Sequence, residues 1–60
     1  MKLKLDMNGN AVGVNSFVAF DKRRSGVIVE IVWGIGDWFA KIQTRSGVFG
    51  RYLKKVSVIR

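Results

Sequence analysis

The sequence predicts a small all-β domain made of short antiparallel strands and tight turns. Residues 26–33 and 38–44 are two runs rich in β-branched and aromatic side chains, separated by two glycines, an isoleucine and an aspartate, which is typical of a hairpin. Asn8-Gly9 and Ser46-Gly47 are further turn signals. The composition, 48% hydrophobic with seven glycines and no proline, suits a compact all-β chain.

The other elements are predicted from alternation and from the positions of the turns. Strict alternation over residues 2–7, with Leu3, Leu5 and Met7 on one side, indicates a half-buried N-terminal strand. After the Asn8-Gly9 turn, residues 17–20 form the next strand, in which Val18 and Phe20 point to the core, and a polar basic loop leads to the hairpin. The later elements are a strand at 48–52, one helical turn at 52–55 and a closing strand at 56–59.

Length and composition exclude several classes of protein. Sixty residues make one small domain, which buries only about 60% of the surface that its unfolded chain exposes. The sequence has no cysteine and no histidine, so disulfides and the usual thiolate and imidazole metal sites are excluded. We expect no metal, no cofactor and no catalytic residue. Because residues 1–9 do not read as a signal peptide and no apolar run reaches about 20 residues, we expect a cytoplasmic protein without a membrane span.

The order of these elements resembles the SH3-like small β-barrels, among them the KOW and Tudor-type modules. The matching segments are FVAFD at 17–21, GVIVEI at 26–31, DWFAKIQT at 37–44, VFGRYLKK at 48–55 and VSVI at 56–59. Residues 6–20 are also similar to the start of small bacteriophage-encoded proteins of this shape, although Asn15 stands where these usually carry an aspartate. The resemblance implies an all-β, five-stranded SH3-like barrel over 17–59, preceded by an N-terminal strand and turn over 1–15, with one short 3-10 turn before the last strand.

The predicted barrel interior takes one face of each strand. In the first arm of the hairpin, Glu30 marks the outer face together with its neighbours in the alternation. Trp33 and Trp38, at the turn ends of the two arms, either cap the barrel or stand partly exposed. Leu3 and Leu5 cover one end. The predicted core residues are Val18, Phe20, Val27, Val29, Ile31, Ala40, Ile42, Val56 and Val58.

The charge of the chain indicates an anionic partner. Eleven Lys and Arg against four Asp and Glu give a formal charge of +7, which attracts nucleic acid first, then an acidic protein surface, then anionic lipid. A general role of this charge in solubility is the alternative. The Lys22-Arg23-Arg24 loop is the strongest candidate site, because three adjacent cations contribute little to folding. Phe39, Lys41, Arg45, Phe49 and Arg51 are expected to form an outward patch. A second basic group near the closing strand consists of Arg51, Lys54, Lys55 and Arg60.

Two functions follow from this pattern. The leading hypothesis is a non-enzymatic module that binds DNA or RNA through phosphate contacts, since basic groups interleaved with rings suit phosphates and unpaired bases. The predicted site residues are Lys22, Arg23, Arg24, Phe39, Lys41, Arg45, Arg51, Lys54 and Lys55. The alternative is a phage-encoded inhibitor or adaptor of an acidic host protein, or a homo-oligomer. It rests on the apolar residues that the predicted core does not use, which are Ile28, Val32, Ile35, Phe39, Phe49 and Ile59. A phage origin would place the protein in the host cytoplasm.

Overall fold

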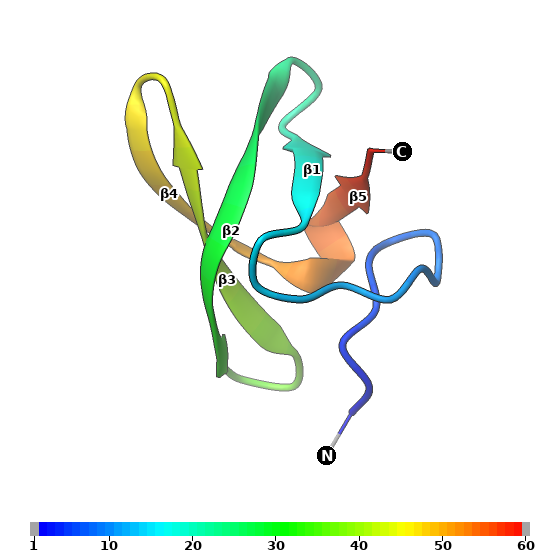
Figure 1. The fold of residues 1–60 in the computed structure, drawn as a ribbon. Coiled ribbons are helices and arrows are strands. Elements are labelled where there is room, and N and C mark those ends of the chain that lie inside the picture. Colours follow the sequence, from blue (N-terminus) through cyan, green and yellow to red (C-terminus); the bar gives the residue numbers. More distant parts are fainter. Residues whose placement is uncertain (1, 60) are drawn as a thin grey trace.

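The computed structural model describes residues 2–59, which form one antiparallel sheet of five strands with a single 3-10 turn (Figure 1). The elements are β1 (Phe17–Phe20), β2 (Arg24–Trp33), β3 (Trp38–Thr44), β4 (Gly47–Tyr52), η1 (Leu53–Lys55) and β5 (Val56–Val58). The predicted strands of residues 17–59 are confirmed to within two residues at each end. No helix of the described residues is long and apolar enough to cross a membrane.

The sheet has the strand order β4-β3-β2-β1-β5 and is not closed. β4 and β5 are its two edges, and η1 joins them along the chain. β2 is the longest strand and pairs with both β1 and β3 (Figure 1). Its first residues therefore lie at the end of the molecule that carries the β1–β2 and β3–β4 turns, and its last residues lie at the opposite end.

A β-bulge in the middle of β2 decides which of its side chains are buried. Ile28 pairs with Ile42 of β3, while Glu30 pairs with the next β3 residue, Lys41, so Val29 is the extra residue between them. An extra residue shifts the alternation by one position. A strand with a bulge therefore presents odd-numbered side chains to the core on one side of the bulge and even-numbered ones on the other.

Because of the bulge, two residues that the sequence predicts in the core lie outside it. Before it, Ile28 is completely buried, and after it Ile31 packs against the core. Val27 and Val29 are instead 36% and 47% exposed, so their predicted place in the core is wrong. The other predictions fare better, since Val18, Phe20, Ala40, Ile42 and Val56 are buried as expected and Val58 packs against them. The buried hydrophobic cluster consists of Val12, Val18, Phe20, Ile28, Ala40, Ile42, Leu53 and Val56.

In the N-terminal segment, the side chains that face the core are not the ones that the alternation of residues 2–7 predicts. It forms no strand over residues 2–7, only an isolated β-bridge between Leu5 and Ala11. Asp6 is buried, whereas Leu3 is 73% exposed, because the Asp6 carboxylate accepts hydrogen bonds that hold it inside. The predicted cover by Leu3 and Leu5 is therefore wrong, and Val12 is the residue of this segment that joins the buried cluster.

The two tryptophans meet at the β2–β3 turn, at the far end of β2 from the β1–β2 turn. Trp33 pairs with Trp38 in a T-shaped contact with 5.2 Å between ring centroids. Trp38 packs against the core, and its indole N–H donates to the Lys2 carbonyl, whereas Trp33 is 42% exposed. One ring thus caps the core while the other stands partly exposed.

Candidate nucleic-acid interface

Strand pairing places four side chains in one row across the sheet. We name the face that carries Val18, Ile28 and Ile42 the inner face, and the opposite one the outer face. Phe17 lies directly opposite Val27, Val27 opposite Gln43, and Gln43 opposite Val48. Directly opposed residues share a face. Because Phe17 alternates with buried Val18, the row belongs to the outer face.

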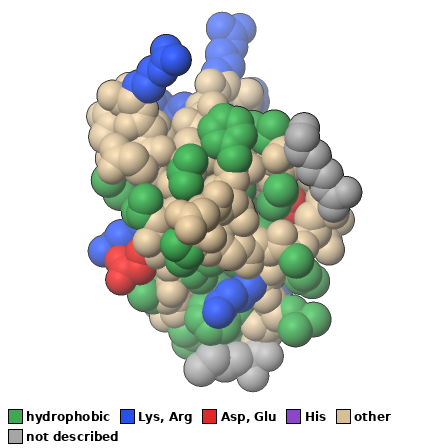
Figure 2. Space-filling model, in the orientation of Figure 1, with side chains coloured by type: hydrophobic (Ala, Val, Ile, Leu, Met, Phe, Trp, Pro, Cys, Tyr) green, Lys and Arg blue, Asp and Glu red, His purple; other side chains and the backbone are tan. Residues whose placement is uncertain are grey.

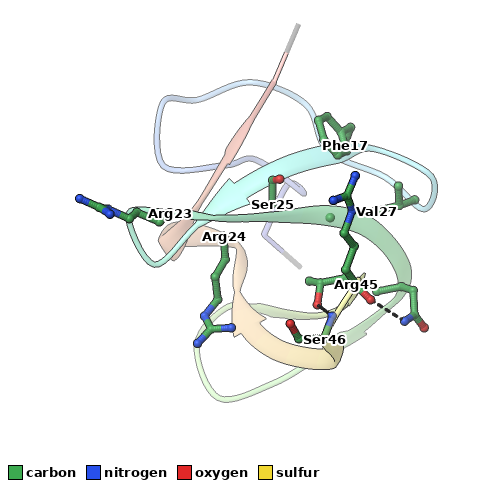
Figure 3. Close-up of a pocket in the computed structure, with 10 residues that line it drawn as sticks. Phe17, Arg23, Arg24, Ser25, Val27, Arg45 and Ser46 are labelled. Atoms are coloured by element: carbon green, nitrogen blue, oxygen red, sulfur yellow. Dashed lines mark hydrogen bonds between the residues drawn. The ribbon is translucent and has the colours of Figure 1, made fainter.

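A groove of about 600 Å³ opens on this face between the β1–β2 turn and the β3–β4 turn (Figure 3). We name it the arginine groove. One wall comes from β1 and the start of β2, and the other from the end of β3 and its following turn. Basic side chains also project from this end of the molecule in the space-filling view (Figure 2). The groove is lined by Phe17, Arg23, Arg24, Ser25, Gly26, Val27, Gln43, Thr44, Arg45 and Ser46.

Two guanidinium groups of the groove have no counter-charge among residues 2–59. Arg45 follows Gln43 by two positions, and its side chain runs toward the part of the groove that Phe17 lines, while Arg23 points outward from the β1–β2 turn (Figure 3). No hydrogen bond or ion pair joins either guanidinium to another of residues 2–59. None of the residues that line the groove is acidic. The groove therefore presents positive charge without compensation.

Arg24, the last cation of the loop, belongs to a cluster in which a carboxylate compensates the positive charge. Arg24 points to the inner side, where its guanidinium lies 4.6 Å from the Phe49 ring centroid and 3.9 Å from an Asp21 carboxylate oxygen. Arg51 donates to both Asp21 oxygens, with Nε–Oδ1 at 3.0 Å and Nη2–Oδ2 at 2.5 Å. The hydrogen bonds from Arg51 hold the pKa of Asp21 below its ordinary value and raise the pKa of Arg51. Of the predicted site residues, Arg24 and Arg51 thus share one carboxylate.

Backbone geometry exposes the tip of the β1–β2 turn. Asp21 and Lys22 both have positive φ, at 51° and 68°, which is the left-handed region and lets the chain reverse within a few residues. The Arg23 N–H donates to the Asp21 carbonyl and closes the turn. Lys22 is exposed at the tip, next to the arginine groove and outside its lining.

The predicted outward patch is split between the two faces of the sheet. Phe49 lies opposite Ile42 and Arg51 opposite Ala40, and both of these partners are buried. Phe49 and Arg51 therefore belong to the inner face, and their predicted outward position is wrong. The β3–β4 turn is the physical reason, because it pairs Thr44 with Gly47 and so fixes the face of every later β4 residue.

Phe39 and Lys41 lie on the outer face but have partners there. The Phe39 ring packs on Gly50, where any side chain would collide with it, and meets Tyr52 edge-on at 5.2 Å between centroids. The Lys41 ammonium lies 3.0 Å from a Glu30 oxygen. Neither residue lines the arginine groove.

The second basic group that the sequence suggests follows β4. The Lys54 ammonium lies 6.0 Å from the Tyr52 ring centroid, and its backbone N–H donates to the Asp37 carboxylate. Lys55 is exposed in η1. Neither lines the groove, and Arg60 lies outside the described residues. The structure therefore places Arg23, Arg24 and Arg45 around one groove and leaves the other predicted residues elsewhere.

Sequence reasoning missed Phe17 as a site residue. The sequence does carry a signal for it, because core positions for Val18 and Phe20 turn Phe17 outward by alternation, and the structure shows Phe17 opposite the exposed Val27. Nothing in the sequence placed it near Arg45, which follows it by 28 positions. Among the described residues, no three His, Cys, Asp or Glu side chains gather as a metal site would require. Comparison of the chain with protein-family models, curated proteins and solved structures found no match.

Proposed function

We propose that this protein is a non-enzymatic nucleic-acid-binding module that contacts phosphates through the arginine groove. The observation that carries the proposal is the uncompensated pair Arg23 and Arg45, held on two sides of a groove without acidic lining. Arginine presents several N–H donors in a planar fork that fits phosphate oxygens. A net charge of +7 adds long-range attraction for a polyanion.

The arrangement of elements supports an SH3-like barrel as the type of fold behind this site. A long, bulged β2 is shared between β1 and β3, and η1 turns the chain from β4 into β5. β5 then pairs with β1. In this fold, the β1–β2 and β3–β4 turns lie at one end, so the proposed site uses two loops held by a rigid sheet.

The proposed contacts favour phosphates over base sequence. Phosphate contacts position a protein on nucleic acid without carrying sequence information. At this end of the described part of the chain, Lys22, Arg23 and Arg45 have no carboxylate partner, whereas Arg24 lines the groove with its guanidinium near Asp21. Engagement of three phosphates, one each by Lys22, Arg23 and Arg45, predicts a slope of log affinity against log salt of about −2.1 on a single strand and about −2.7 on duplex.

The test is fluorescence-anisotropy titration of labelled DNA and RNA over a salt series with the parent and an Arg23→Ala/Arg45→Ala variant. Loss of two phosphate contacts is expected to weaken binding at least tenfold and to reduce the salt slope by about 1.4 on a single strand. Both side chains are exposed and neither forms an ion pair with the described residues, so the free energy of unfolding is expected to change by less than about 0.5 kcal/mol.

A Lys41→Ala/Lys55→Ala variant is the matched control, because it removes the same formal charge outside the groove. Its affinity is expected to fall slightly, because the smaller net charge weakens the long-range electrostatic attraction. Its salt slope is expected to stay near that of the parent. Equal losses in the two variants would show that net charge alone drives binding. Absence of any binding at near-physiological salt would overturn the proposed function.

Exposed apolar residues favour a protein partner as the second candidate function. Ile35 at the β2–β3 turn is 93% exposed, and Val32 and Val48 of the outer face are about half exposed. Such residues on so small a surface fit an interface with an acidic protein or with a second copy of the chain. Sedimentation of the purified protein distinguishes these cases, and a monomer that retains no protein in a pull-down would exclude both.

A further inference from the structure

We infer that the arginine groove takes single-stranded nucleic acid and stacks one unpaired base on the Phe17 ring. The inference rests on the proposed function and names its substrate class. The chain has seven aromatic residues, which are four Phe, two Trp and one Tyr. Six of these rings form three ring–ring contacts, which are Phe20–Phe49, Trp33–Trp38 and Phe39–Tyr52.

Phe17 is the ring that remains. It has neither a second ring nor a cation against it among residues 2–59, and it is 46% exposed. Phe17 does not contribute to the core, because Val18 and Phe20 are the β1 residues that fill the inner face. An exposed ring at the wall of a positively charged groove is the arrangement with which proteins bind unpaired bases.

The surroundings of Phe17 fit a nucleotide. Val27 lies directly opposite in the row and extends the apolar surface, while Gln43 comes next with an exposed amide. The Gln43 Nε2 donates to the Thr44 carbonyl, which holds the amide at the groove. Arg45 then supplies a cation from the same side of the sheet (Figure 3). The volume of about 600 Å³ falls within the roughly 300–1,000 Å³ of small-molecule sites.

A duplex cannot use this surface in the same way. Its bases are already paired and stacked inside the helix, so stacking on Phe17 requires unpairing that costs a few kcal/mol. A single strand turns a base outward at little cost while its phosphates lie against Arg23 and Arg45. Stacking is tolerant of base identity because every base has a flat aromatic face. We therefore expect preference for single strands with little sequence selection.

The experiment compares a short oligothymidylate with an oligonucleotide of equal length whose sites are abasic, so that phosphates are kept and bases removed. Anisotropy is measured with the parent, Phe17→Ala, Phe17→Leu and Phe17→Tyr. We expect base removal to weaken the parent about tenfold and to leave the affinity of Phe17→Ala unchanged. Phe17→Leu keeps apolar bulk without a ring and is expected to behave as Phe17→Ala, whereas Phe17→Tyr binds like the parent.

Trp33→Leu is the matched control, because it removes a partly exposed ring at the other end of β2. It is expected to lose no affinity for either oligonucleotide. Thermal unfolding of each variant confirms that it is folded. Parent binding that is indifferent to base removal, or Phe17→Leu that binds as well as the parent, would overturn the stacking inference.

These outcomes separate the inference from the function on which it rests. Equal or tighter binding to duplex, with a loss in Arg23→Ala/Arg45→Ala, would overturn single-strand stacking and leave the phosphate-binding groove intact. No binding to any of the nucleic acids would overturn both.

Discussion

Asp6 and the pair Arg23 and Arg45 are charged groups in contrasting surroundings. The Asp6 carboxylate is buried at 6% exposure and accepts hydrogen bonds from the backbone N–H groups of Asn8, Asn10 and Val58. The two guanidinium groups are exposed and line a groove without a carboxylate. Hydrogen bonds within the protein satisfy the Asp6 carboxylate, whereas the guanidinium groups of the groove are accessible to a ligand.

The contrast separates the residues that hold the fold from those proposed to bind. Asp6 ties the turn at residues 7–10 to β5, since its Oδ1 accepts from the turn and its Oδ2 from Val58. In a domain of this size such a link matters, because the total free energy of unfolding is only about 3–9 kcal/mol. The groove cations have no comparable link. We therefore expect substitution of Asp6 to lower the free energy of unfolding, and substitution of the groove cations to weaken binding.

The largest expected effect is that of Asp6→Ala on stability. Three backbone N–H groups lose their acceptor, and unsatisfied buried donors cost about 1–3 kcal/mol each, so we expect a loss of about 3 kcal/mol with partial rescue by water. Urea unfolding followed by tryptophan fluorescence measures it. Asp21→Asn is the control, because that carboxylate is exposed and bonded only to side chains of the described residues, and asparagine tolerates the positive φ of 51° at this position. A urea midpoint in Asp6→Ala equal to that of the parent would contradict the anchoring role.

A smaller effect is expected from pH. Burial by itself raises the pKa of Asp6, but the hydrogen bonds from Val58, Asn10 and Asn8 together outweigh it, and the pKa lies below its ordinary value. A carboxyl with a lowered folded-state pKa contributes stability that is complete above its unfolded pKa of about 3.9 and is lost as the pH falls through the folded-state pKa.

The measurement is urea unfolding of the parent and Asp6→Asn at several pH values below about 5. The parent is expected to lose stability in this range more steeply than Asp6→Asn, since asparagine takes up no proton. Parallel curves for the two proteins would show that Asp6 does not carry the pH dependence.

The sequence predicted the strands better than the faces of the strands. β1, β3 and β4 follow from alternation and from the glycines of the turns beside them, and these local signals lie within or next to each segment. The bulge at Val29 has no local signal, because both faces of β2 carry apolar residues and either alternation looks acceptable. The prediction for the N-terminal segment was wrong for a similar reason. Asp6 is held inside partly by a hydrogen bond that it accepts from the backbone N–H of Val58, 52 positions away.

The candidate site was predicted in part. The basic tripeptide at 22–24 and Arg45 stand out by charge alone. Their division into a compensated Arg24 and uncompensated Arg23 and Arg45 depends on the face to which each side chain turns and on the distance from Asp21. Phe17 was visible as an outward ring, but its place beside the β3–β4 turn depends on two successive strand pairings.

The most direct test of the arginine groove is amide chemical-shift mapping of the labelled protein during titration with a short single-stranded oligonucleotide. Binding in the arginine groove predicts that shifts concentrate at Phe17, residues 23–27 and residues 43–46, at one end of β2. Residues 33–38 at the other end, including the exposed Ile35, should remain unshifted. Shifts that concentrate at residues 33–38 instead, or that spread evenly over all exposed cations, would contradict a binding site in the arginine groove.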